Sequence, residues 1–541
     1  MPRAIASAII EASIKEGVQT KDAFFAVSRK VCNAEGVQMP DIPTIRQTLQ
    51  KMVDAGEIPE QPLLNSFLVR RDVRTMSGVA IITVLTKPYP CPGKCVYCPT
   101  EAIMPKSYLS NEPAAMRALV NEFDPFDQVW TRLETLSNNG HATDKIELIV
   151  KGGTWSAYAW EYQQWFIRRC FDAANSFGLA QRDSSRTLAE AQDKNEIAGH
   201  RIIGLTIETR PDWISVKEII RLRTLGVTRV ELGVQSVDDR MLEITKRGHN
   251  VASVRRAAQL LRDAGYKTDF HMMPQLPLAT PESDLAELKL IFDDPDFRPD
   301  MIKIYPCVVV ELAELYDWWK DGTYKPYPDS DLLEMLIKAK QYIPRYCRIS
   351  RLIRDIPGTS IVAGNMITNL REEAQKEMKK RGVSCKCLRC REIGRMKMEE
   401  PALATAEPVL FDDTFEASHG EEHFLSMEDS ERKAVFAFCR LRLPPKQPIG
   451  DSAELWQKME EIQGAAFIRE LHTYDKMVRI NTHIEGVSQH TGLGRALMQR
   501  AEDIARNAGY KKLAVISGIG VREYYRKLGY ETRGTYMVKD L

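Results

Sequence analysis

The pattern of apolar and polar positions predicts helices over residues 1–74. Within the stretch PTIRQTLQKMVDAGEI, the side chains of Ile45, Leu49 and Met52 fall on one helical face, and Gly56 marks the end of the helix. We therefore predict a helical N-terminal extension. Three arginines lead out of it and are candidates for phosphate contacts, with a solvated charged edge as the alternative: Arg70, Arg71 and Arg74.

Over residues 75–357, six apolar runs alternate with segments that have the spacing of amphipathic helices. The runs are VAIITVL, IELIVKGG, RIIGLTIETR, RVELGVQS, KTDFHMMP and MIKIYPCVVV. Strands that alternate with helices along a chain usually form a parallel sheet. We predict an α/β fold here, a partial barrel of six β/α units. In such a barrel the chemistry collects at the carboxyl ends of the strands.

The remaining residues divide into a linker and a further domain. Residues 358–404 are rich in charge and contain a group of cysteines. Residues 405–541 begin with strand-like runs separated by turns, namely PVLFDDTF, EEHFLSME, AVFAFCRLRLP and AAFIRELHTY, and continue with a long helical segment. This order predicts an α+β domain with antiparallel strands.

Composition narrows the class of protein only slightly. A chain of 541 residues with 44% hydrophobic and 28% charged residues is expected to form several globular domains, and its net charge of +1 announces neither nucleic acid nor membrane. The 11 cysteines are an odd number and fall mostly in two groups, which favours metal chemistry in a reducing compartment. No apolar run reaches the roughly 20 residues that span a bilayer. We expect a cytoplasmic protein.

Three cysteines, Cys91, Cys95 and Cys98, follow the first predicted strand with the spacing C-x3-C-x2-C. A disulfide would leave one of them unpaired, and zinc usually takes two separated pairs. Three thiolates can instead hold three irons of a [4Fe–4S] cluster and leave the fourth iron open to another ligand. The loop resembles that of the radical S-adenosylmethionine enzymes, including an aromatic residue, Tyr97, before the last cysteine.

Other residues at predicted strand ends agree with this resemblance. Gly152 and Gly153, in KGGTW, resemble the glycine-rich edge with which the superfamily pairs the methionine moiety of its cofactor, although a simple turn would look the same. Polar networks in the core are the alternative for four further candidates for cofactor or substrate contacts: Glu208, Arg210, Gln235 and His271.

A glycine turn opens the long helix of the last domain. The stretch QHTGLG fits the Q/R-x-x-G-x-G/A pattern of GNAT acetyltransferases, in which free N–H groups at the start of a helix bind a pyrophosphate. We expect an acetyl-coenzyme A site here, with a plain helix start as the alternative. Its residues are Gln489, His490, Thr491, Gly492, Leu493, Gly494 and Arg495, together with the strand residues that would meet the pantetheine arm, Glu470, Leu471, His472 and Thr473.

The two motifs in one chain resemble the family of the catalytic subunit of the Elongator complex. The resemblance extends over nearly the whole chain and includes CVYCP, IETRPDW, LGVQSV, HMMPQLP, FRPDMIKIYP and YYRKLGY. The close spacing of the first two cysteines is similar to that of the stand-alone bacterial and archaeal members. The resemblance implies that the chain makes 5-carboxymethyluridine at the wobble position of transfer RNA from acetyl-coenzyme A. A 5′-deoxyadenosyl radical from S-adenosylmethionine would activate the acetyl group.

The resemblance also implies partners and individual roles. Lys145 matches a position associated with acetyl-coenzyme A, with a solvated lysine as the alternative. Tyr524 and Tyr525 match closing tyrosines, one of which would contact the thioester. The partners are the anticodon stem-loop of transfer RNA, which the N-terminal extension is a candidate to bind, and an electron donor. A homodimer is an open question. Two rival functions remain: a protein lysine acetyltransferase with a structural iron–sulfur cluster, and an RNA-binding scaffold.

A second group of cysteines, in CKCLRC, lies one ligand short of a tetrahedral zinc site. It comprises Cys385, Cys387 and Cys390, and we expect Cys307, at the end of a predicted strand, to be the fourth ligand. Such a site would staple the barrel to the linker. A second iron–sulfur cluster and unliganded cysteines are the alternatives. The basic run over residues 379–397 is the main candidate for phosphate contacts, with a solvated basic face as the alternative. The stretch RISRLIRD is another candidate, with Arg348, Arg351 and Arg354.

Overall fold

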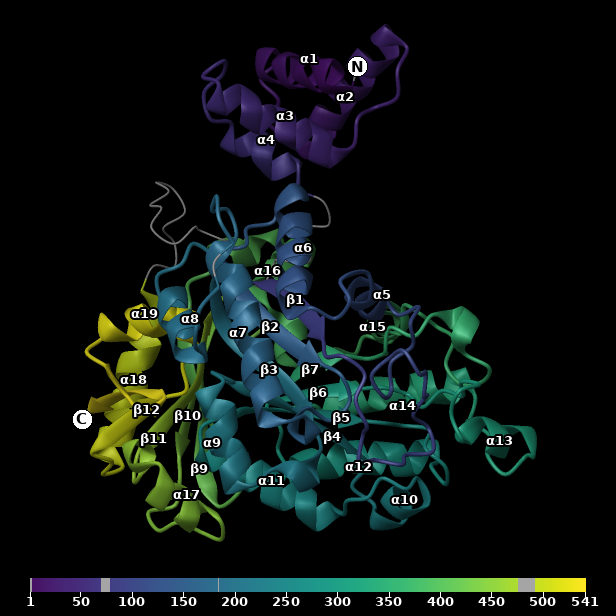
Figure 1. Cartoon of the computed structure of the whole chain (residues 1–541), viewed down its shortest axis with the longest axis vertical. Helices are drawn as coiled ribbons and strands as arrows, with labels where there is room; N and C mark the ends of the chain where they lie inside the picture. The colour runs from purple at the N-terminus through teal and green to yellow at the C-terminus, as the bar shows by residue number, and fades with distance from the viewer. Residues whose placement is uncertain (1, 70–77, 183, 475–491) are drawn as a thin grey trace.

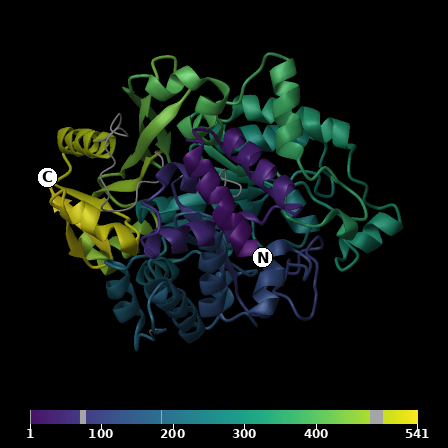
Figure 2. The same ribbon diagram turned by 90° about the horizontal axis from the view of Figure 1, so that it is seen from above.

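The computed structural model describes residues 2–69, 78–182, 184–474 and 492–541. Its N-terminal extension consists of four helices, α1 (Pro2–Lys15), α2 (Lys21–Glu35), α3 (Ile42–Asp54) and α4 (Pro62–Phe67). They enclose a small apolar core of their own, which includes Ile9, Phe24 and Leu49. The extension stands at one end of the molecule, next to α6 (Pro125–Asn138) (Figure 1). Seen from above, it overlies the middle of the molecule (Figure 2).

The second region is an open sheet of seven parallel strands in the order of the sequence. The strands are β1 (Ala80–Leu85), β2 (Lys145–Lys151), β3 (Arg201–Thr209), β4 (Arg229–Gln235), β5 (Lys267–Met272), β6 (Met301–Ile304) and β7 (Arg348–Arg351). The predicted partial barrel is confirmed, and the six predicted runs are β1 to β6. The seventh strand, RISR, has only four residues and both begins and ends with arginine, so its sequence resembles a basic surface segment.

Helices cover the outer face of this sheet (Figure 1). In this region α5 (Pro113–Val120) lines the cavity inside the barrel, and α10 (Asp239–Ile244) and α13 (Leu315–Lys320) pack against the loop that follows β1. The helices outside the sheet are, besides α6, α7 (Trp160–Ser176), α8 (Leu188–Asn195), α9 (Val216–Thr224), α11 (Val251–Asp263), α12 (Pro281–Asp293) and α14 (Asp329–Tyr342). In β2 the side chains of Ile146, Leu148 and Val150 are buried in the core on this face. The alternate positions turn inward. The interior of the barrel therefore receives polar side chains such as Glu147 and Lys151.

A linker with α15 (Leu370–Lys380) and α16 (Ile393–Glu399) leads to the last domain. The described residues of that domain form a seven-stranded sheet in the order β13-β14-β12-β11-β10-β9-β8, and among their pairings only that of β11 with β12 is parallel. Its strands are β8 (Val409–Ala417), β9 (Gly420–Glu428), β10 (Val435–Leu443), β11 (Ala466–Thr473), β12 (Lys512–Val515), β13 (Glu531–Arg533) and β14 (Tyr536–Asp540). Its helices are α17 (Ser452–Lys458), α18 (Leu493–Asn507) and α19 (Arg522–Arg526).

Buried ion pairs join the two sheets. Arg469 in β11 binds Asp300, which precedes β6, at 2.6 Å, and Arg442 in β10 binds Asp263 in α11 at 2.5 Å. All four side chains are almost completely buried. Apolar side chains of both domains also belong to one continuous core. The barrel and the last domain therefore form one packed unit. No helix in the described part of the chain is both long and apolar enough to cross a membrane.

Candidate active site

One cavity, with a volume of about 950 Å³, is lined by residues of both domains. The barrel contributes the three loop cysteines and the inward-facing side chains of its strands, including Lys151, Glu208, Arg210, Gln235 and His271. The last domain contributes Phe438 from β10 and Glu470, His472 and Tyr474 from β11 and its end. The cavity thus joins the predicted cluster loop to the predicted coenzyme A strand.

The cysteine loop lies at one end of this cavity. A Cβ atom on Gly93 would lie 3.5 Å from Cys95 Sγ, 3.6 Å from Cys91 Sγ and only 2.7 Å from the guanidinium of Arg210. The loop can therefore bring two thiols and this arginine together because residue 93 has no side chain. Arg247 donates a hydrogen bond to Cys95 Sγ at 3.4 Å.

The electrostatics of the loop favour a thiolate at Cys95. A hydrogen bond from Cys98 and the charge of Arg247 outweigh burial and lower the pKa of Cys95 to about 4. Two guanidinium groups, of Arg210 and Arg247, also bring positive charge to the place where an anionic cluster would sit. The donor set therefore fits a [4Fe–4S] cluster, which Cys91, Cys95 and Cys98 would hold.

The glycine-rich end of β2 presents bare backbone beside the loop. Gly152 has φ = 140°, and a Cβ atom there would lie 1.8 Å from Thr86 Oγ1. Only glycine fits this position. The next residue, Gly153, has φ = 78° and lines the cavity. This edge fits the close approach of the methionine moiety of S-adenosylmethionine.

Two carboxylates, two lysines and a histidine form an ionic cluster inside the barrel. Glu208 accepts a hydrogen bond from Tyr108 at 3.1 Å and lies 3.8 Å from Lys151 and 3.4 Å from His271. On the other side, His271 contacts Glu231 at 3.1 Å. Burial alone would raise the pKa of Glu208, but Lys151 and His271 hold it well below its usual range. Glu208 is therefore an ionised acceptor that faces the cavity.

Sequence reasoning found only part of this cluster. It named Glu208 and His271 but missed four side chains that contact them or each other: Tyr108, Lys151, Glu231 and Lys303. The signal was present, because Glu231 lies four residues before Gln235 on the same strand and so shares its face. The two other barrel candidates have unusual surroundings. Gln235 has φ = 72°, and Arg210 forms two hydrogen bonds with Asp212 while its Nη1 is buried without a partner.

Alternate residues of β11 face two different places. Glu470 and His472 line the cavity. Leu471 and Thr473 turn to the start of α18, where their side chains come within 3.8 and 3.6 Å of a Cβ atom placed on Gly494. The pairing of β11 with β12 covers Ala466–Ile468, and among the described residues no strand pairs with the later backbone of β11 on that side. This is the geometry that a pantetheine arm requires.

The helix that follows begins at a glycine in the left-handed region. Gly492, with φ = 103°, is the N-cap of α18, and Leu493 is its first residue. Arg495 is exposed in the first turn, and its charge acts on Tyr524. The free N–H groups at this helix start fit a pyrophosphate. Gln489, His490 and Thr491 lie outside the described residues, as do Arg70, Arg71 and Arg74.

The three residues predicted for the acetyl group lie in different environments. The Tyr524 hydroxyl is beside Gly494, whereas Tyr525 is buried and burial raises the pKa of its hydroxyl. Lys145 begins β2 at the amino end of the strand and does not line the cavity. The structure therefore brings Tyr524 to the predicted coenzyme A site but does not bring Lys145 there.

The second cysteine group is a compact thiol cluster. The Sγ atoms of Cys385, Cys387 and Cys390 all lie within 4.8 Å of one another. Ligands of one zinc ion, with Zn–S bonds of about 2.3 Å, must lie this close. A hydrogen bond from Cys385 holds the pKa of Cys387 well below its usual range, and the charge of Lys340 adds to this effect. The donor set fits a metal ion.

The prediction that Cys307 is the fourth ligand is wrong. Cys307 is not part of the thiol group within 4.8 Å, although both regions are described. It is fully buried in another apolar cluster with Cys95 and Tyr97, and its N–H donates to the carbonyl oxygen of Pro274 at 2.8 Å. The end of β6 directs this residue under the cysteine loop, away from the linker.

Comparisons with known families agree with both halves of the site. The profile of the Radical SAM superfamily matches residues 89–277, that of the Radical SAM C-terminal domain matches residues 299–380, and that of the Acetyltransferase (GNAT) family matches residues 395–530. Fold and profiles together define an enzyme of the radical SAM class with a GNAT acetyltransferase domain.

Relatives are similar over most of the chain. The tRNA uridine(34) acetyltransferase of Methanocaldococcus infernus is 46% identical over 494 residues, which cover 89% of each chain. Human Elongator complex protein 3 is 38% identical over 486 residues, or 88% of this chain and 86% of the human protein. A solved structure of the M. infernus Elp3 without residues 1–46 has 42% identity and a TM-score of 0.72, covering 86% of this chain and all of that one. The chain belongs to this family of tRNA uridine(34) acetyltransferases and Elongator complex proteins 3.

Proposed function

We propose that this enzyme forms 5-carboxymethyluridine at the wobble position of transfer RNA from acetyl-coenzyme A, with S-adenosylmethionine as the radical source. The observation that carries the proposal is the cavity shared by the cysteine loop and β11. An acetyl group on coenzyme A has an inert methyl C–H bond, so a radical site and a coenzyme A site need a common space. The names of the relatives, tRNA uridine(34) acetyltransferases, indicate the substrate, which is uridine 34 of transfer RNA.

At the loop end of the cavity, we assign the cluster to Cys91, Cys95 and Cys98 and the S-adenosylmethionine to the strand ends. Bound together, these cofactors supply a radical that can activate an unreactive C–H bond, once an external donor has provided an electron. The backbone of Gly152 and Gly153 leaves room for the methionine moiety. Glu208, Arg210 and Gln235 offer polar partners around it.

At the other end, we assign acetyl-coenzyme A to the open edge of β11 and the start of α18. The backbone of Glu470–Thr473 lies beside the pantetheine arm, and the N–H groups of Leu493, Gly494 and Arg495 bind the pyrophosphate. Tyr524 is the tyrosine that is positioned to contact the coenzyme, because its hydroxyl lies beside Gly494. Lys145, for which the family resemblance suggests a role, would act from outside the cavity.

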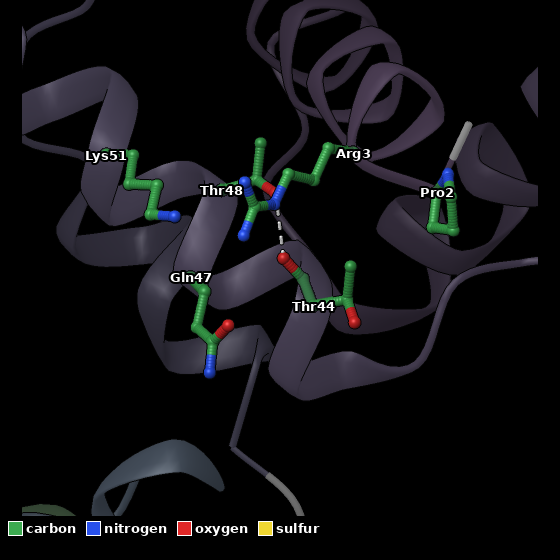
Figure 3. Close-up of a pocket in the computed structure, with 6 residues that line it drawn as sticks. All are labelled: Pro2, Arg3, Thr44, Gln47, Thr48 and Lys51. Carbon is green, nitrogen blue, oxygen red and sulfur yellow. Dashed lines mark hydrogen bonds between the residues drawn. The ribbon is translucent and has the colours of Figure 1, made fainter.

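The RNA substrate engages through its anticodon stem-loop, and the N-terminal extension offers it a polar hollow. A pocket of about 370 Å³ lies between α1 and α3 and is lined by Pro2, Arg3, Thr44, Gln47, Thr48 and Lys51. Figure 3 shows the cationic ends of Arg3 and Lys51 turned toward the same space. Two cations and no carboxylate line this pocket, so it favours an anion such as a phosphate.

Cys95→Ala tests the proposed function. We expect the variant to form no 5-carboxymethyluridine in an anaerobic assay analysed by nucleoside mass spectrometry, and to contain less cluster iron than the wild type. Cys32→Ala, which removes a thiol from the core of the N-terminal extension, is the control and should retain both. Full activity of Cys95→Ala would refute the proposal. Acetylation of protein lysines without S-adenosylmethionine would favour a lysine acetyltransferase instead.

We also propose that Cys385, Cys387 and Cys390 hold a zinc ion that staples the linker to the barrel. The thiol group follows α15, and the N–H of Leu388 donates to the carbonyl oxygen of Cys347, just before β7, at 2.9 Å. A metal ion here would fix the linker at the point where the two domains meet, and the binding free energy would add to stability.

A further inference from the structure

Four arginines converge on the part of the cavity next to β11. They come from separate segments: Arg348 begins β7, Arg371 lies in α15, Arg389 lies between two cysteines of the thiol group, and Arg395 lies in α16. All four line the cavity. The charges of Arg348, Arg371 and Arg395 all act on Arg389. The linker and the barrel therefore place four like charges together.

Carboxylates balance this charge only in part. Glu392 lies among the four arginines and forms ion pairs with Arg348 and with Arg395, the latter at 3.3 Å. Arg371 Nη2 donates to the carbonyl oxygen of Ile349 at 3.0 Å, and the thiols of the cysteine group act on its charge. Its Nη1 is buried without a hydrogen-bond partner.

Arg389 is the least compensated member. The residue is half-buried, its Nε is fully buried without a partner, and the guanidinium forms no hydrogen bond or ion pair with any residue in the described part of the chain. Burying part of a charged group without a partner is costly. A guanidinium can recover this cost by binding a phosphate through two parallel hydrogen bonds. The arrangement therefore indicates a phosphate ligand.

The proposed function involves two substrates that carry phosphates, coenzyme A and RNA, and the two faces of β11 distinguish between them. The coenzyme A phosphates belong at the start of α18, which Leu471 and Thr473 face. The arginines lie with His472 and Tyr474 on the opposite face, and Arg348 donates to the Tyr474 hydroxyl at 3.2 Å. A phosphate on this face is therefore that of the other phosphate-rich substrate, the RNA backbone.

We propose that Arg348, Arg371, Arg389 and Arg395 form a binding site for a backbone phosphate of the RNA substrate, an inference that rests on the proposed function. This proposal assigns phosphate contacts to only some of the arginines in the basic run over residues 379–397. Arg391 in that run forms a buried ion pair with Glu428 at 2.7 Å, and Arg381 binds Glu334 at 2.6 Å. These two arginines serve the fold, whereas Arg389 and Arg395 face the cavity.

Arg389→Gln in the full chain tests this site. Lys386→Gln is the matched control, because it removes the same charge from between two cysteines of the thiol group, and Lys386 is exposed outside the cavity. Each protein is titrated with a transfer RNA transcript at several salt concentrations, and separately with coenzyme A. Metal content and Tm are measured on the same preparations.

We expect Arg389→Gln to weaken RNA binding by about tenfold, as the loss of a charge-assisted hydrogen bond does. The slope of log Kd against log salt should fall by about 0.7–0.9, the value for one phosphate contact. Affinity for coenzyme A should not change, and Lys386→Gln should match the wild type. Arg395→Gln, which lies outside the thiol group, should show the same loss and repeats the test if Arg389→Gln loses metal.

Two results would overturn the site: RNA affinity that both arginine variants retain, or a loss confined to coenzyme A. The latter would assign the phosphate to the coenzyme. Failure of the proposed function is a separate result. A wild-type chain that binds transfer RNA without forming 5-carboxymethyluridine would refute the function, and the titrations would still decide the arginine site.

Discussion

At the scale of single residues, a Cβ atom on Gly494 would lie 2.9 Å from the Tyr524 hydroxyl. Heavy atoms of this kind do not approach so closely without a shift. Gly494 is also buried in the first turn of α18, where backbone N–H groups are free to bind an anion. One hydrogen atom in place of a methyl group therefore keeps the tyrosine next to the helix start.

Gly494→Ala should push Tyr524 away and weaken coenzyme A binding by about tenfold, or about 1.4 kcal/mol. Isothermal titration with coenzyme A measures this. In a Tyr524→Phe background the hydroxyl is absent, so the same alanine should cost less. An equal loss in both backgrounds would show that the tyrosine does not lie where the structure places it.

At the scale of elements, the thiol group joins the linker to the barrel at a junction where Leu388 and Cys347 are both fully buried. Lys340, from α14, is fully buried near this region, and its ammonium has no hydrogen-bond partner among the described residues. Its charge favours the ionised form of Cys387. A bound cation with three thiolates carries a net negative charge and would compensate this lysine.

Cys387→Ser should therefore lose the metal and lower Tm by several degrees, because both the metal staple and the partner of Lys340 disappear. Metal analysis of the purified protein and a thermal scan measure the two effects. Cys439→Ser, a buried thiol in β10, is the control for the loss of a thiol and should retain the metal. A wild-type protein that contains no bound metal would contradict the zinc proposal.

The elements also show how far sequence reasoning reaches. Periodicity identified β1 to β6 because long apolar runs depend only on local burial. It missed β7, whose four residues have too little apolar character to show a period. Spacing along the chain identified the thiol group at residues 385–390, since those ligands are neighbours. It failed for Cys307, because pairing residues some 80 positions apart depends on how the barrel packs.

At the scale of the whole molecule, charged residues bind the two sheets together. Asp300 receives two hydrogen bonds from Arg469, at 2.6 and 2.7 Å, and one from the N–H of Thr268. Burial opposes ionisation, but Arg469 and Arg440 hold the pKa of Asp300 below its usual range. No sequence pattern predicted this network. The alternation of a strand indicates whether an arginine faces solvent or the core, but not which residue it contacts.

Asp300→Asn should lower the free energy of unfolding by about 3–5 kcal/mol, because it leaves a buried arginine uncompensated. Chemical denaturation measures the change. Asp451→Asn is a suitable control, since its ion pair with Arg256 also joins the two domains but is partly exposed. That variant should cost at most about 1 kcal/mol. Equal effects would mean that burial does not decide the strength of this interface.

The alternation of side chains along β11 has a consequence for the evolution of the enzyme. Neighbouring positions of this strand face different substrate sites. A shift in its register by a single residue would therefore exchange the side chains that face the cavity with those that face the start of α18. Arg469, one position before Glu470, forms a buried ion pair with Asp300, and this pair fixes the register of the strand. We expect insertions and deletions to be tolerated around this strand but not within it.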